Sequence, residues 1–259
     1  MKRPENQRQK ETKRRVINFD RTVSTKENLQ VLYEDNHLII VNKRVGDIVQ
    51  GDKTKDKPLS EVVKEYIAIK HHKKGNVYLG VVHRLDRPTS GVVIFARTSK
   101  ALARLNKMLR DKTIQKTYLA VVKNTPEKQQ DTLIHFLRKN PKNNKAIVFN
   151  SETENTKKAI LHYKIRQKLD NYTVLEIDLE TGRHHQIRAQ LSVIKSPIKG
   201  DLKYGFDRSN KNGGIHLHAY KIRFNHPVKK DLSLDKPLEI SVFAQTPNDV
   251  IWNCFLHNS

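Results

Sequence analysis

The sequence predicts an α+β protein with one domain, built around a central mixed, mostly antiparallel sheet with flanking helices. Apolar β-branched runs outnumber amphipathic helical segments, and many of these runs are close enough in sequence to be hairpin neighbours. No fixed-period repeat and no Gly/Ser-rich linker divides the 259 residues. These observations favour one sheet over separate domains.

The first half of the chain is expected to alternate strands with helices. Apolar residues alternate with polar ones around residues 29–33, and residues 37–43 form a β-branched run, so two short strands are expected. A polar loop over residues 46–58 precedes a helix over residues 58–69, where apolar residues recur at helical spacing. Two further β runs, residues 80–85 and 91–96, flank a polar turn, and Ser99 is expected to cap a second helix.

Strand patterns dominate after Lys112. A helix is expected over residues 184–194, after Gly182. A short terminal helix is expected to contain Cys254 as a packed residue. The expected strands are residues 116–122, 132–137, 145–149, 160–166, 172–179, 215–224 and 238–244.

The charge of the chain indicates a polyanionic partner. Fifty Lys and Arg face 27 Asp and Glu, a formal charge of +23. A surplus of this size favours nucleic acid, because each neutralised phosphate releases condensed counterions, although a merely soluble basic protein is the alternative. Residues 1–28 are expected to form a basic, disordered tail, and residues 29–259 the folded domain.

Several classes of protein are poorly supported. A single cysteine excludes an internal disulfide and a cysteine-based zinc or iron–sulfur site. No apolar run is long enough to span a membrane, and the basic start lacks the apolar stretch of a secretory signal, so a cytoplasmic protein is expected. The adjacent pairs His71–His72 and His184–His185 would not face each other on a helix, and no metal site is expected.

The first chemical motif surrounds Asp86, on the connection between two predicted strands. Arg84 and Arg87 flank it, and nearby opposite charge favours an ionised carboxylate that can act as a nucleophile. The alternative is an ordinary turn aspartate that caps backbone amides.

Two further motifs lie downstream. Residues 180–188 read Glu-Thr-Gly-Arg-His-His-Gln-Ile-Arg, and this helix start suits a phosphate or a carboxylate. A solvated basic helix start is the alternative there. Lys116 and Tyr118 open a strand, where the tyrosine is either half-buried or able to stack on an unpaired base.

Together these motifs resemble the RluA-type pseudouridine synthase family. The family's HRLDxxTSG element matches residues 83–91, its Lys-x-Tyr element residues 116–118, and its TGRxHQxR element residues 181–188. Residues 196–201 resemble its (H/S)PIxGD turn, and residues 217–219 with 226–227 resemble its LHA…HP segment. The resemblance spans roughly residues 29–245. It departs from the family at residues 42–46, which read NKRVG where relatives have NKPxG.

The resemblance implies a cytoplasmic enzyme that converts uridine in RNA to its carbon-linked isomer in a basic cleft, without a metal or organic cofactor. It assigns the nucleophile to Asp86, its arginine partner to Arg188, and stacking on the uracil, with assistance in proton removal, to Tyr118. Extruding a uridine from folded RNA also requires groups that hold the backbone. The expected RNA-binding residues are Arg84, Arg87, Lys116, Arg183, His184 and Gln186.

The resemblance leaves the substrate open. Family members act on large-subunit ribosomal RNA, on transfer RNA or on both, and ribosomal RNA is favoured here. The 28 residues before the first predicted strand are too few for the amino-terminal S4-type module of many relatives. The compact architecture that is predicted favours a monomer. A non-catalytic RNA- or ribosome-binding protein with the same fold is the main alternative, and an acid–base nuclease lacks a suitably placed second carboxylate or histidine.

Overall fold

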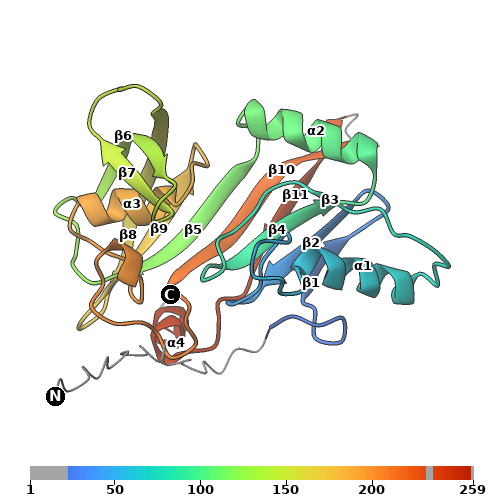
Figure 1. Ribbon diagram of the computed structural model, residues 1–259, viewed down its shortest axis with the longest axis horizontal. Helices are drawn as coiled ribbons and strands as arrows, with labels where there is room; N and C mark the ends of the chain where they lie inside the picture. The colour runs from blue at the N-terminus through green and yellow to red at the C-terminus, as the bar shows by residue number, and fades with distance from the viewer. Residues whose placement is uncertain (1–22, 232–235, 258–259) are drawn as a thin grey trace, which may run out of the picture.

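The computed structural model describes residues 23–231 and 236–257. Within these ranges all strands join one eleven-stranded sheet (Figure 1), and every neighbouring pair is antiparallel except β4 with β10. The prediction of an α+β domain with a mixed, mostly antiparallel sheet is therefore confirmed. In spatial order the strands are β1 (Val31–Glu34), β2 (Leu38–Lys43), β4 (Ser90–Ala96), β10 (Leu217–Asp231), β5 (Gln115–Val122), β9 (Thr173–Leu179), β8 (Lys157–Lys168), β6 (Gln130–Asn140) and β7 (Lys145–Phe149), with β3 (Gly80–Val81) on β4 and β11 (Lys236–Phe243) on β10.

Strands β2 and β4 lie between two helices. Both strands are buried on both faces, which explains why their sequences are continuous apolar runs instead of alternating ones. Helix α1 (Leu59–Lys70) packs on the face that carries Ile39 and Val93, and helix α2 (Ser99–Arg110) packs on the opposite face with Ile40 and Ile94. Each of these buried aliphatic side chains contributes roughly 1.5–3 kcal/mol of transfer free energy to folding.

The two predicted helices of the first half are present, with one difference at a cap. The capping residue of α2 is Thr98, whose hydroxyl accepts a hydrogen bond from the Ala101 amide at 3.2 Å. Ser99 is already the first helical residue, so the prediction that Ser99 caps the helix is wrong. Thr98 has the extended backbone (φ −139°) that a capping residue requires.

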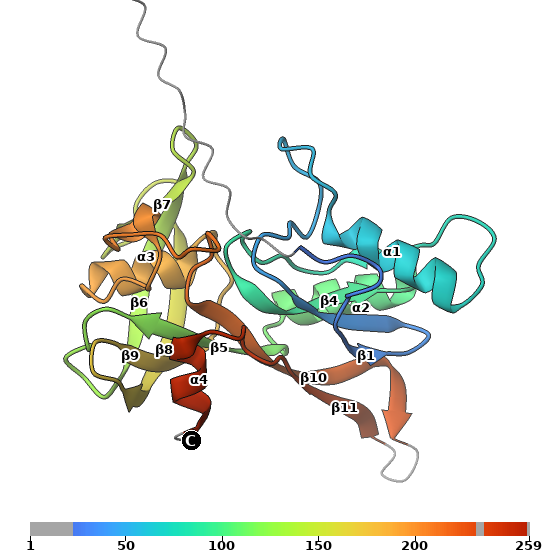
Figure 2. The ribbon, with the colours of Figure 1, turned by 90° about the horizontal axis from the view of Figure 1, so that it is seen from below.

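The second half of the chain forms the other part of the sheet. Helix α3 (Gln186–Val193) packs near β6 and β7, whereas helix α4 (Val250–His257) covers β5 and β9 through Trp252 and Phe255. Figure 2 shows β5 and β10 running between the part that carries α1 and β1 and the part that carries α3, β6 and β7. Residues from both parts can therefore meet beside β5 and β10.

Strand β3 is shorter than the predicted run of residues 80–85. It pairs with β4 only at Gly80 and Val81. Two residues later the ring of His83 accepts a hydrogen bond from the Ile94 amide at 3.2 Å, taking the place of a backbone partner. The chain is thereby free to leave the sheet as the loop of residues 82–89, which carries Asp86.

The two ends of the described chain differ from expectation. Ser24 is buried, and its amide and hydroxyl bond the Asp47 carboxylate at 2.8 and 2.7 Å, so the chain packs against the domain before Leu29. The rest of the expected tail, residues 1–22, lies outside the described residues. Cys254 is exposed and not packed, because α4 turns Trp252 and Phe255 toward the sheet instead. Among the described helices, none is both long and apolar enough to cross a membrane.

A substitution at Gly91 tests how closely β4 and β10 approach. Gly91 has φ +115°, and a Cβ atom there would lie 2.3 Å from the Ala219 carbonyl oxygen. We expect Gly91→Ala to lower the free energy of unfolding by about 3 kcal/mol or more, since neither backbone can retreat without breaking the ladder. Urea denaturation measures this change. Gly51→Ala, with no atom within 4 Å of its Cβ, is the control, and equal stability of the two variants would contradict the account.

Candidate active site

A cavity of about 720 Å³ opens beside β5, where the two parts of the sheet meet. Its walls are the loop that carries Asp86, the end of α2, the start of β5 and the segment between β9 and α3. Among the residues predicted to be catalytic or to bind RNA, only Arg87 does not line this cavity. Those that do are Arg84, Asp86, Lys116, Tyr118, Arg183, His184, Gln186 and Arg188.

The loop that carries Asp86 is fixed from behind by Lys43. The Lys43 side chain is fully buried, and its Nζ donates hydrogen bonds to the carbonyls of Arg44, Arg87 and Thr89 at 2.9, 3.2 and 2.6 Å. Two of these carbonyls belong to the loop. The Asp86 side chain itself remains 30% exposed, so the loop is anchored while its carboxylate faces the cavity.

The Arg188 guanidinium joins two carboxylates. Its Nη1 lies 2.9 Å from Asp86 Oδ2, while Nε and Nη2 donate to the two oxygens of Asp201 at 2.6 and 2.8 Å. Asp201 is 1% exposed, so this bidentate pair is enclosed by protein. Burial alone would lower the pKa of Arg188, but Asp201 and Asp86 together raise it above its ordinary value, and the group stays charged.

The pKa of Asp86 lies below its ordinary value. Partial burial works to raise it, but His185, Arg188 and the hydrogen bond from Arg188 outweigh burial. Burial lowers the pKa of His185 to about 3, against the attraction of Asp86, so its ring is neutral near pH 7. The lasting positive charge beside the carboxylate is therefore that of Arg188.

The groups that lower the pKa of Asp86 differ from the two arginines predicted to do so. Arg87 turns away from the cavity and pairs with Asp56 at 2.5 Å and with Asp52 at 3.8 Å. Arg84 lines the cavity, but forms no hydrogen bond or ion pair with Asp86 among the described residues. The prediction that Arg84 and Arg87 hold Asp86 ionised is wrong, because residues adjacent in sequence project in different directions from the turn.

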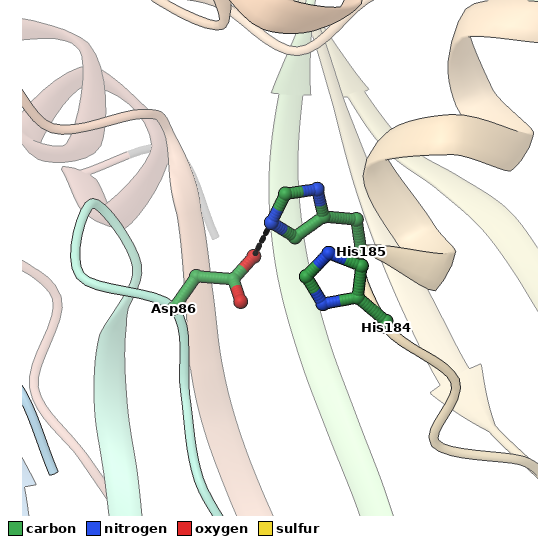
Figure 3. A group of neighbouring side chains, drawn as sticks. All are labelled: Asp86, His184 and His185. Atoms are coloured by element: carbon green, nitrogen blue, oxygen red, sulfur yellow. Dashed lines mark ion pairs between the residues drawn. The ribbon is translucent and has the colours of Figure 1, made fainter. Parts of the chain in front are cut away.

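His184 and His185 stack on each other beside Asp86 (Figure 3). Their ring centroids are 3.8 Å apart, and His185 Nε2 lies 3.5 Å from Asp86 Oδ2. The argument that adjacent histidines cannot face each other fails here, since α3 begins only at Gln186. His185 precedes it in the left-handed conformation (φ 52°), which brings the two rings together.

Asp86, His184 and His185 present ligand atoms within 4.8 Å of one another, a spacing that could hold a metal ion. The donor set fits a cation poorly, because the Arg188 guanidinium already lies 2.9 Å from Asp86 Oδ2 and would repel it. That the site works without a metal stays a prediction.

Tyr118 and Gln186 both line the cavity, one with an aromatic ring and the other with an amide group. Tyr118 is 7% exposed, and burial together with the Asp86 charge raises its pKa, so the phenol is neutral. The Gln186 side chain makes internal bonds: Oε1 accepts from the Thr181 hydroxyl and the Arg183 amide, and Nε2 donates one of its two hydrogens to the Ile160 carbonyl. Gln186 therefore holds the turn before α3, and its contact with RNA stays a prediction.

The sequence reasoning gave no role to Lys43 or Asp201. Each is a buried charged residue that positions another element, and each stands in a segment already noticed, residues 42–46 and 196–201. Their place inside two segments that belong to the family resemblance was the available signal. Their partners, 44 residues and 13 residues away respectively, could not be read from spacing.

Comparisons with known proteins agree on one family. A family model described as RNA pseudouridylate synthase matches residues 37–193. The chain is 35% identical over 224 residues to "Ribosomal large subunit pseudouridine synthase C" of Buchnera aphidicola, covering 82% of this chain and 68% of the relative. It is 31% identical over 221 residues to "tRNA pseudouridine synthase C" of Pectobacterium carotovorum, covering 77% and 56%.

A solved structure has the same fold. "Human RNA Pseudouridylate Synthase Domain Containing 4" superposes with a TM-score of 0.69 at 21% identity, covering 88% of this chain and 92% of that one. At this identity the likeness supports the fold alone.

Removing the Arg188 charge tests the electrostatics of the cavity. We expect Arg188→Gln to raise the pKa of Asp86, because the anion loses its nearby cation and a hydrogen bond. Carbon-13 NMR of the carboxyl groups, titrated with pH, measures this pKa directly. Arg84→Gln is the matched control and should produce a smaller change. An unaltered Asp86 pKa in folded Arg188→Gln would show that another group sets it.

Proposed function

This chain belongs to the RNA pseudouridylate synthase family and is an isomerase that acts on RNA, and we propose that Asp86 is the nucleophile with which it isomerises uridine. The observation that carries the proposal is the ion pair between Arg188 and Asp86. It holds a carboxylate ionised and oriented at a cavity, which is the condition that nucleophilic catalysis requires.

In the proposed reaction, the Asp86 carboxylate adds to a uridine that has been extruded from the RNA. The bond between the ribose and N1 of uracil breaks, the base turns, and a new bond forms between the ribose and C5. The bond between Asp86 and the substrate breaks, which returns the free carboxylate. The proton on C5 is lost and N1 gains a proton, so product and substrate have the same composition. This sequence needs only the groups of the chain itself and no cofactor.

Other residues of the cavity would hold the substrate. We assign stacking on the uracil to the Tyr118 ring, which lines the cavity. Because the pKa of Tyr118 is raised, its neutral phenol is a poor base, and we do not assign proton removal to its anion. Arg84, Lys116 and Arg183 also line the cavity and supply positive charge for the RNA backbone.

We propose large-subunit ribosomal RNA as the substrate and the cytoplasm as the place of action, with the chain as a monomer. A relative named for large-subunit ribosomal RNA is 35% identical over 82% of this chain. Transfer RNA is the alternative, since another relative is named for it at 31% identity. Residues 1–22 lie outside the described ranges, and we propose that the cations there add to RNA binding.

Replacing Asp86 tests the proposal. We expect Asp86→Asn to lower the rate of tritium release from RNA labelled at C5 of uridine by at least about a thousandfold, because the amide is not a nucleophile. RNA affinity should stay within about threefold of wild type, since the substitution removes a negative charge and leaves the cations in place.

The measurement uses ribosomal and transfer RNA separately under single-turnover conditions. The control is Asp207→Asn, an exposed aspartate paired with Lys123, which should release tritium at the wild-type rate. Release from one RNA alone names the substrate class. Release by folded Asp86→Asn at the wild-type rate would exclude Asp86 as the nucleophile.

A further inference from the structure

The sheet face of β6, β7 and β8 that points away from α3 carries an uncovered cluster of apolar and basic side chains. Its exposure distinguishes it from the opposite face of the same strands, where Leu137 and Ala146 are buried. Helix α4 covers this side of the sheet only over β5 and β9, through Trp252 and Phe255. We call the cluster the outer patch, and it consists of Ile134, Phe136, Arg138, Ile147, Phe149 and Lys158.

The strand register places these side chains together. Phe136 pairs with Phe149 across β6 and β7, and Arg138 pairs with Ile147. On the other side of β6, Phe136 pairs with Lys158 of β8. Directly paired residues of antiparallel strands project to the same face, so the two phenyl rings are neighbours, with Lys158 beside Phe136 and Arg138 beside Phe149.

The composition of the outer patch favours a partner with both flat apolar groups and negative charge. Ile134 is 50% and Ile147 is 37% exposed, and both phenyl rings are partly exposed. The Arg138 guanidinium lies over the Phe149 ring, 5.0 Å from its centroid. Within the described ranges, neither Arg138 nor Lys158 forms an ion pair with an acidic side chain. Aromatic rings on a sheet surface beside free cations suit unpaired nucleotides, whose bases stack and whose phosphates pair with the cations.

The outer patch is continuous with the cavity. Arg183, which lines the cavity, donates a hydrogen bond from Nε to the Lys158 carbonyl at 2.9 Å. Glu180 also lines the cavity, and its carboxylate lies 3.6 Å from the ring of His162, two residues beyond Ile160 on β8. Residues that line the cavity therefore contact β8, the strand that carries Lys158 of the outer patch.

We propose that the outer patch binds unpaired nucleotides of the RNA substrate that flank the target uridine, with bases stacked on Phe136 and Phe149 and phosphates against Arg138 and Lys158. This inference rests on the proposed function, because it takes the RNA of that reaction as the partner. It adds a second contact surface outside the cavity, and so a means of selecting RNA whose target lies in an unpaired segment.

Fluorescence anisotropy with a fluorescein-labelled 12-nucleotide oligouridine tests the proposal, in the full-length Asp86→Asn background so that no turnover occurs. Phe136→Leu and Phe149→Leu keep apolar volume but remove the stacking ring, and each should weaken binding about tenfold. The matched control is Phe243→Leu, which removes an exposed ring with Lys221 over it, on β11 and outside the patch. Its affinity should stay within about twofold. Equal affinity of all three variants and the parent would overturn the proposal.

Two further measurements cover the remaining outcomes. If the leucine variants fail to fold, the double variant Arg138→Gln, Lys158→Gln should still weaken binding. The slope of log K against log salt concentration should become shallower by the equivalent of one to two phosphate contacts. An unchanged slope would overturn the proposal. Irradiating a 5-iodouridine oligonucleotide with the parent protein should attach RNA to peptides that contain Phe136 or Phe149. Attachment elsewhere only would also overturn it.

The tritium assay keeps this proposal separate from the proposed function. Tritium release by wild type with unaltered oligouridine binding in the leucine variants would reject the outer patch and leave the reaction standing. Weakened binding in those variants without tritium release from any RNA would support the patch as an RNA surface and reject the assigned reaction.

Discussion

The arrangement of the cavity depends on one guanidinium shared between two carboxylates. Asp201 is enclosed by protein, and leaving it without a cation would cost several kcal/mol, so Arg188 must face it in the folded chain. That bidentate contact fixes the direction of the remaining nitrogen, which reaches Asp86 at 2.9 Å. The buried pair of Arg188 and Asp201 thus fixes the guanidinium, and the partly exposed Asp86 carboxylate is the group that a substrate can reach.

The two sides of the ion pair come from distant parts of the sequence, and the sheet brings them together. Asp86 precedes β4, while Arg188 lies on α3, 102 residues later. Between them, β10 pairs with β4 in parallel and with β5 in antiparallel fashion, and Gly91 allows the close approach of β4 to β10. Lys43 then fixes the Asp86 loop through backbone carbonyls. The Asp86 carboxylate is therefore held by the fold on one side and by Arg188 on the other.

Local patterns in the sequence were sufficient to predict most helices and strands and most of the functional residues that line the cavity. Residues 145–149 were predicted as a strand with the observed bounds of β7, because a short apolar run with β-branched residues is a local property. The direction of Arg87, the stacking of His184 on His185 and the anchoring role of Asp201 could not be predicted in this way. Each depends on partners across the fold or on a single left-handed residue, which spacing along the chain does not encode.

The central claim is that Asp201 acts through Arg188 to hold Asp86 ready for reaction. Single-turnover tritium release by Arg188→Gln, Asp201→Asn and the double variant tests it as a double-mutant cycle. If the claim holds, both single variants are slow, and the double variant is no slower than Arg188→Gln, since Asp201 has no function once Arg188 is gone. Losses that multiply in the double variant would contradict the claim and assign Asp201 a separate role.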